Sequence, residues 1–321
     1  MALFMEQLII VFNAVAPFFL IMGLGWFVRR REMVSEKFFP GVSKVAFFCL
    51  FPTMLFLNIY RADLAAAFDP VLVSYLVGGT VLIYAVLWFV SARFIKDKQQ
   101  LVVFVHAGHR GNYIVLALPI VGVLMGPEAL PTTALMLPLL VTVYNILAAT
   151  LFVVNGLDNN SSGFAQVKDV LLGILKMPMI IAAIIGLTVN FSGLSLPVVV
   201  ERGFSSLVDM AAPAGLIAIG GALSMEKMRR NLDMAIKATV VKNLLVPLVF
   251  IVPAVLLGFR GIDLAIIAMT GLVPVTPVTY VLAVEMGGDA DSAASCLILS
   301  NVAAIFTVVP ALAVLRMFGL F

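Results

Sequence analysis

The sequence predicts an all-α membrane protein: ten transmembrane helices in two inverted five-helix repeats, with helices 4 and 9 broken and crossing. Three observations lead to this fold class. The 321 residues are 63% hydrophobic and 12% charged, whereas a soluble domain is about 45–50% apolar and 25% charged. Charge-free runs of helix length fill the chain, which has a mean hydropathy of +1.15. A polar stretch near the middle divides these runs into two equal sets.

The first half contains five charge-free runs, at residues 7–28, 45–60, 70–92, 111–127 and 129–157. A membrane-spanning helix needs about 20 apolar residues, because it crosses about 30 Å of hydrocarbon at 1.5 Å per residue. The second and fourth runs reach this length when Lys44 and Arg110 are allowed inside them. Residues 1–157 are therefore expected to form the first repeat.

The second half repeats this organisation, with runs at residues 177–200, 210–225, 243–259, 264–284 and 292–315. The eighth reaches full length when Lys242 is included. Residues 158–169 are predicted to be a cytoplasmic linker, and residues 170–321 the second repeat. Because five spans are an odd number, the second repeat must be inverted relative to the first. Pro52 and Pro213, each in the middle of the second span of its half, support a duplication.

Basic residues predict the orientation. They cluster after spans 1, 3, 5 and 7, at Arg29, Arg30, Arg31, Lys37, Arg93, Lys96, Lys98, Lys168, Lys227, Arg229, Arg230 and Lys237. The opposite loops contain only Arg61, Arg202 and Arg260, with Arg316 near the C-terminus. The positive-inside rule then places both termini on the non-cytoplasmic side. We expect a multi-pass protein of the plasma membrane, or inner membrane in a bacterium, and the net charge of +3 is too small to suggest nucleic acid as a partner.

Two spans are interrupted at mid-depth. His109 and Arg110 precede Gly111-Asn112 in span 4, and Pro274 and Pro277 bracket Thr276 in span 9. A break in a membrane helix is unfavourable, because every backbone group must be satisfied without water. Breaks at corresponding positions of two halves are the best sequence indication of a transporter's binding site. The alternative is that the prolines only kink a helix.

The breaks predict an anion site. Asn112 is expected to cap the half-helix that follows it, and Thr276-Pro277 to be the N-cap and first residue of another. Each helix N-terminus is equivalent to about half a positive charge. Arg110 and Lys242 lie roughly 16 and 15 Å into their spans, near the midplane. We expect Arg110 to be a counter-charge for a carboxylate. For Lys242 two interpretations stay open, a counter-charge or a donor to unwound carbonyls of the crossing helix.

Other polar residues near the breaks complete the candidate site. Tyr113, Thr279, Asn145 and Asn301 are candidate substrate-binding residues, although mid-span amides also bridge helices. His106 and His109 can carry a coupling proton or be structural. Sodium coupling is equally open, because Asn112, Thr276, Thr279 and Asn301 offer oxygen ligands. The sequence predicts no cofactor and no bound metal.

Enzyme chemistry is not indicated. No Asp or Glu lies inside a charge-free run, and nucleophile-elbow, zinc-protease and phosphate-binding motifs are absent. The prediction is a secondary active or facilitative transporter of small organic anions. An anion channel or uniporter, and a non-transporting membrane receptor, are the alternatives.

Two segments resemble a known family. His109-Arg110-Gly111-Asn112 through Leu118-Pro119-Ile120, and Pro274 through Glu285-Met286-Gly287, are similar to the fourth and ninth helices of the auxin efflux carrier family. Lys242 and Pro247 fit its eighth helix, and the resemblance covers the whole chain. The family includes plant PIN-FORMED auxin exporters and bacterial malonate-type carriers, and is related to bile acid transporters.

The resemblance implies a mechanism and an assembly. Spans 1, 2, 6 and 7 would form a scaffold, spans 3–5 and 8–10 a transport domain that moves like an elevator, and spans 2 and 7 a homodimer interface. The chain departs from the plant members at Gly111, where they have proline, and in its short central loop. Small mono- or dicarboxylates, malonate among them, are therefore expected in preference to auxin.

Overall fold

The computed structural model describes residues 2–35, 37–63, 68–155, 176, 178–222 and 231–321, and within these ranges its regular structure is helical, with one isolated bridge. Seven helices in the described ranges are long and apolar enough to cross a membrane. Three shorter apolar helices, Tyr113–Met125, Pro178–Ser192 and Gly261–Leu272, accompany them. The prediction of an all-α, multi-pass membrane protein is confirmed.

Six of the described apolar helices are uninterrupted: α1 (Ala2–Arg30), α5 (Pro70–Phe94), α8 (Leu130–Val154), α10 (Pro178–Ser192), α11 (Val198–Ala222) and α17 (Ala290–Met317). α5 begins where the Asp69 carboxylate accepts hydrogen bonds from two backbone amides, and α17 begins at the equivalent cap, Asp289. The remaining apolar segments of the described chain contain a π turn or an interruption.

A π turn lies in three helical segments. One segment is α2 (Phe38–Val45), η1 (Ala46–Leu50) and α3 (Phe51–Tyr60), and another is α13 (Leu232–Val240), η4 (Val241–Leu245) and α14 (Val246–Leu256). The third is η2 (Tyr113–Ala117) with α7 (Leu118–Met125), which the 3-10 turn η3 (Pro127–Ala129) joins to α8. Each π turn ends two residues before a proline, at Pro52, Pro119 or Pro247. Because proline lacks an N–H and crowds the carbonyl four residues earlier, the wider turn lets the helix continue through it.

Two apolar stretches are interrupted, and they are those predicted. α6 (Lys98–His109) stops before η2, and α15 (Gly261–Leu272) stops before α16 (Val278–Glu285). Arg110 and Val273 both have extended backbone angles directly after a helix.

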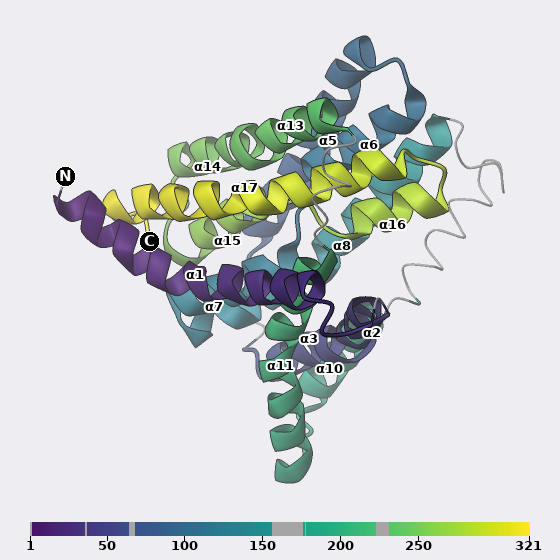
Figure 1. The fold of residues 1–321 in the computed structure, drawn as a ribbon. Coiled ribbons are helices and arrows are strands. Elements are labelled where there is room, and N and C mark those ends of the chain that lie inside the picture. The colour runs from purple at the N-terminus through teal and green to yellow at the C-terminus, as the bar shows by residue number, and fades with distance from the viewer. Residues whose placement is uncertain (1, 36, 64–67, 156–175, 177, 223–230) are drawn as a thin grey trace.

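The helices form two packing groups (Figure 1). In the lower part of the view, α11 contacts α2 and α3, and α3 contacts α10, whereas α5, α6 and α13 to α17 lie above them. α8 contacts α5 and also α3 and α10. α1 contacts both α11 and α17. It approaches α11 closely, because a Cβ on Gly25 or Gly220 would overlap the backbone of Ile217 or Met22.

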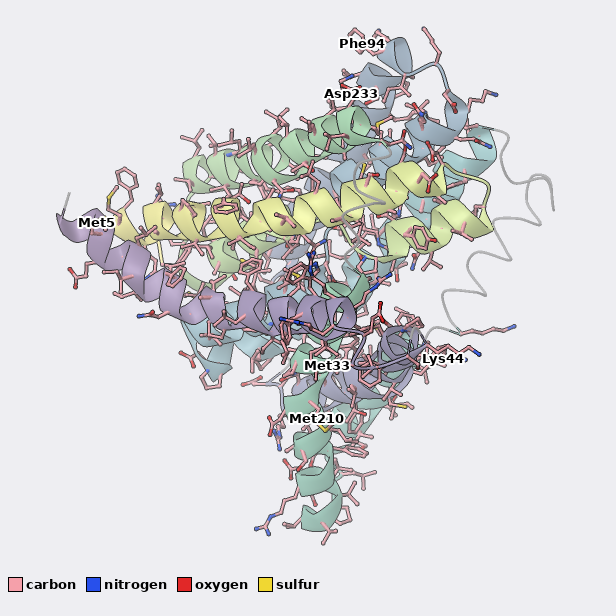
Figure 2. All side chains as sticks on the ribbon, in the orientation of Figure 1. Met5, Met33, Lys44, Phe94, Met210 and Asp233 are labelled. Atoms are coloured by element: carbon pink, nitrogen blue, oxygen red, sulfur yellow. The ribbon has the colours of Figure 1, made fainter. Side chains whose placement is uncertain are left out.

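Large apolar side chains are exposed on the outside of several helices. Figure 2 shows Met5, Phe94 and Met210 on the outside of α1, α5 and α11, and these side chains are 49%, 79% and 57% exposed. Large exposed apolar side chains on the spans suit a protein that faces lipid rather than water.

The boundary between spans 6 and 7 differs from the prediction. α10 ends at Ser192 and α11 begins at Val198, so Arg202 lies inside α11 and not in a loop. Gly193, with φ of 67°, and Pro197 make the turn. The charge pattern was misleading because charged residues can occupy the first turns of a helix, as Glu201 does in α11, where it pairs with Arg61 at 2.7 Å. The predicted linker 158–169, Lys168, Lys227, Arg229 and Arg230 lie outside the described residues.

Candidate functional site

The two interruptions lie against each other. Gly111 and Val275 form an isolated antiparallel bridge, and the Asn112 amide donates to the Pro274 carbonyl at 2.9 Å. The unwound segments therefore satisfy part of each other's backbone hydrogen bonding, which a membrane helix otherwise satisfies internally.

Glycine at position 111 permits this approach. A Cβ there would clash with the Val273 side chain and lie 3.0 Å from the Val273 carbonyl oxygen and 3.1 Å from Lys242 Nζ. Only a residue without a side chain lets the two segments come this close.

Lys242 contacts the backbone of the second interruption. Its side chain is fully buried within η4, and Nζ donates to the Gly271 carbonyl at 2.9 Å. Gly271 is the penultimate residue of α15, where carbonyls lose their intrahelical partners. This contact is the one that the structural interpretation of Lys242 requires, and Lys242 is absent from the lining of the cavity described below.

A network that the sequence did not predict holds the same segment. Ser300 Oγ accepts from the Val275 amide at 3.0 Å and donates to Asn243 Oδ1 at 2.6 Å. Asn301 Nδ2 donates to the Val275 carbonyl at 3.0 Å. Asn243 and Ser300 each adjoin a residue already singled out, Lys242 or Asn301, and that adjacency was the available signal.

A cavity of about 550 Å³ lies beside the crossing. Its polar lining consists of Ser43, Lys44, Arg110, Asn112, Tyr113, Tyr144, Asn145 and Thr276. Much of the remaining wall is apolar and includes Phe47, Phe48, Phe51, Leu137, Leu140 and Met179. Polar groups from both interruptions thus meet an apolar chamber, which is the usual character of a small-molecule site.

A second cavity, of about 980 Å³, shares the lining residues Ser43 and Ala218 with the first. It is bounded by Arg29 and Glu32 at the end of α1 and by Tyr280 of α16. The second cavity therefore adjoins the first on the side of the basic end of α1.

Arg110 is the cation at the polar end of the central cavity. Its side chain is 7% exposed, donates from Nη1 to Asn145 Oδ1 at 3.0 Å, and lies over the Tyr144 ring at 5.6 Å. Neither Arg110 nor Lys242 forms an ion pair with any residue that the structure describes. A buried guanidinium without a carboxylate partner is unfavourable unless an anion visits it.

Asn112 differs from the prediction in one respect. It occupies the N-cap position of η2, but its side chain makes no capping hydrogen bond. Nδ2 is buried and has no hydrogen-bond partner within the described part of the chain, although the residue lines the cavity. A π turn follows instead of the expected α-helix, so the geometry assumed for a side-chain cap is not present.

The predicted cap at Thr276 is also wrong. α16 begins at Val278, with Pro277 at its N-cap position and no side-chain cap. Thr276 lies one residue outside the helix, accepts the Thr279 amide at its carbonyl, and lines the cavity with Pro277.

The other candidates divide between cavity and interior. Tyr113 and Asn145 line the cavity, and the Tyr113 hydroxyl donates to the Thr133 carbonyl at 3.2 Å. Pro274, Thr279 and Asn301 are absent from the lining. Thr279 Oγ1 instead lies 3.0 Å from His106 Nδ1, so it connects α16 to α6.

The comparisons with known proteins decide the family. A profile described as membrane transport protein matches residues 10–310. The chain belongs to this membrane transport protein family. Its alternative designation is the auxin efflux carrier family, so the resemblance carried by the fourth and ninth spans is confirmed.

One relative of this membrane transport protein comes from Methanothermobacter thermautotrophicus. It is described as an uncharacterized transporter and is 22% identical over 285 residues, which are 87% of this chain and 90% of the relative. Membrane transport, and not enzyme catalysis, is the activity of the family.

Proposed function

We propose that the chain is a secondary active or facilitative carrier of small organic anions, with the anion bound beside Arg110 between the two interruptions. One observation carries this proposal: a buried guanidinium without an ion-pair partner and the unpartnered Asn112 amide line the same cavity within the described structure. Both groups donate hydrogen bonds, and carboxylates accept them from guanidinium and amide groups.

The lining favours a particular shape of anion. Two cations among the described residues line the cavity: Arg110 is buried at its polar end, whereas Lys44 is exposed at the surface of the protein. A second carboxylate in the apolar part of the chamber would face Phe47, Phe51 or Met179 and would lose hydration there without gaining a partner. A monocarboxylate with an apolar body therefore fits better than malonate, although both remain in the proposed class.

Alternating access is proposed to follow from the arrangement of the helices. α1, α2, α3, α10 and α11 would be the scaffold, and the other spans the moving transport domain of an elevator. This assignment treats the chain as ten spans in two inverted repeats, with the three shorter apolar helices included. The separate packing groups in Figure 1 support it.

Membrane placement and assembly complete the proposal. With both termini outside a plasma membrane, the second cavity, near Arg29, faces the cytoplasm, and the structure corresponds to an inward-facing carrier. A homodimer through α2–α3 and α11 is proposed from the family resemblance. Light scattering of detergent-purified protein tests the dimer, and reporter fusions to each terminus test the orientation.

A binding panel tests the proposed function. Benzoate, malonate and indole-3-acetate, with neutral benzamide as the matched control, are titrated into purified protein by calorimetry. We expect benzoate to bind more tightly than malonate and benzamide not to bind. Asn112→Leu removes the free amide and should weaken benzoate by about 0.5–1.5 kcal/mol, the usual net value of one hydrogen bond.

Flux assays in vesicles complete the test. A carrier gives saturable flux that an anion on the opposite side accelerates, whereas a channel gives single-channel currents. If benzamide binds as tightly as benzoate, the proposal that the site selects anions is contradicted. If Asn112→Leu leaves the benzoate affinity unchanged, the anion binds elsewhere. Imposed sodium and pH gradients then identify the coupling ion.

A further inference from the structure

A buried cluster of aromatic and imidazole rings lies next to Arg110. The His109 ring centroid is 5.2 Å from that of Tyr84, 5.4 Å from His106 and 5.8 Å from Tyr144. All four side chains are at most 5% exposed, and of these four only Tyr144 lines the cavity. Tyr144 thus belongs both to the cluster and to the lining of the cavity, and Arg110 lies over its ring, so the cluster lies directly beside the cavity.

The hydrogen bonding of His109 fixes which nitrogen is free. Nδ1 lies 2.7 Å from the Val105 carbonyl oxygen, which only accepts hydrogen bonds. Nδ1 therefore carries the hydrogen, and in the neutral ring Nε2 has an open lone pair. Nε2 is buried and has no hydrogen-bond partner among the residues that the structure describes, and the same is true of the Tyr84 hydroxyl.

The charges around His109 link it to the anion. The titratable groups that face it are Tyr84 from α5, His106 and Arg110 from the α6 segment, Tyr144 from α8 and Lys242 from η4. A proton on Nε2 would be a third positive charge beside the two cations, with no carboxylate of the described residues paired to either. An anion at Arg110 offsets that repulsion, so anion and proton favour each other's binding reciprocally.

We propose that Nε2 of His109 is a proton-binding site coupled to the anion site, so that the carrier moves one proton with each monoanion. This inference rests on the proposed function, since it requires an anion beside Arg110. The proton adds to the Nε2 lone pair, while Nδ1 keeps its hydrogen bond to Val105. Because the proton and the monoanion carry opposite charges, binding both of them leaves the net charge of the site unchanged.

His106 provides a matched comparison. It lies on the same helix one turn earlier, and its Nδ1 faces the Thr279 hydroxyl, which can donate or accept. Its tautomer is therefore not fixed in the way that Val105 fixes that of His109.

Calorimetry of purified wild-type protein tests the linkage directly. Benzoate is the probe, because a carboxyl group of this kind stays ionised above about pH 5.5. Titrations in two buffers with different ionisation heats count the protons taken up. We expect up to about one proton per benzoate bound, and an affinity that rises by up to about tenfold per unit fall in pH between about 8 and 5.5.

Two variants locate the proton. His109→Asn keeps a donor for the Val105 carbonyl but removes the basic nitrogen, so proton uptake and the pH dependence of affinity should disappear. His106→Asn should retain both. In vesicles with His109→Asn, the initial rate of benzoate uptake driven by a pH gradient should fall to that of protein-free vesicles, which measures passive entry of the neutral acid.

The outcomes separate the inference from the function on which it rests. Benzoate binding without proton uptake, or proton uptake that survives His109→Asn, overturns the inference and leaves the anion site intact. Absence of benzoate binding at every pH contradicts the proposed function instead. If His109→Asn is unstable, His109→Gln and the wild-type proton count still decide the question.

Discussion

The two helix interruptions meet at one bridge, but their surroundings differ. The first, at Arg110–Asn112, presents a guanidinium and a free amide to the cavity. The second, at Val273–Thr276, is held mainly through its backbone, because Ser300 and Asn301 bond the amide and carbonyl of Val275. Lys242 donates a hydrogen bond to the Gly271 carbonyl in α15, the helix that precedes this second interruption. A break of similar appearance in the sequence can thus supply ligand-binding groups or a rigid support for them.

The largest effect is expected from breaking the contact between the two interruptions. Gly111→Ala places a methyl group against Val273 and Lys242 Nζ, so the free energy of unfolding should fall by about 3 kcal/mol, the upper range for overpacking. Thermal melting in detergent measures this. Gly78→Ala is the matched control, because a Cβ on Gly78 in α5 meets nothing within 4 Å. Equal melting temperatures for the two variants would show that close approach at Gly111 is not required.

Arg110→Gln tests whether the first interruption binds the anion. Loss of a charge-assisted donor should weaken benzoate binding by about 1.5–3 kcal/mol, or about ten- to a hundredfold, as calorimetry measures. Arg110→Lys should retain more benzoate affinity than Arg110→Gln but less than the wild type, because an ammonium group cannot make the two parallel hydrogen bonds of a guanidinium. Thermal stability without benzoate should change less than affinity does. Unchanged affinity would remove Arg110 from the site.

Lys242→Met tests whether the second interruption is a support. The Gly271 carbonyl would lose its buried donor, which should lower the free energy of unfolding by about 1–3 kcal/mol with or without benzoate. Lys237→Met, in the same span, removes a surface pair with Asp233 and should change stability by less than about 0.5 kcal/mol. Loss of benzoate affinity with normal stability in Lys242→Met would exchange the proposed roles of the two cations.

The parts of the fold that depend on local sequence could be predicted. Charge-free length located most spans, and Gly111, Pro274 and Pro277 located both interruptions, because membrane helices tolerate few breaks. The end of α10 was misplaced because the turn at Gly193–Pro197 contains no charge, whereas Glu201 and Arg202 lie within a helix.

Contacts between spans that are far apart in the chain could not be predicted from the sequence. Asn243 and Ser300 are 57 positions apart, and nothing local indicates that they bond to each other. Thr279 and Asn301 were correctly placed near the interruptions, but depth in the membrane does not determine whether a side chain faces the cavity. Thr276 and Asn112 were assigned as caps from residue type, which assumes the ordinary helix start that neither position has.

The π turns have a consequence for comparing this chain with its relatives. A π turn bonds each amide one residue further back, so it accommodates one more residue than an α turn, and the helix beyond it is rotated by about 100° relative to an uninterrupted α-helix. Lys242 in η4 and Phe250 in α14 both lie against Gly271 of α15, so the rotation keeps residues on either side of the π turn facing the same neighbour. An alignment that shifts the chain by one residue between these positions would pair lipid-facing residues of one protein with buried residues of another. The prolines at 52, 119 and 247 mark where such a shift is to be looked for.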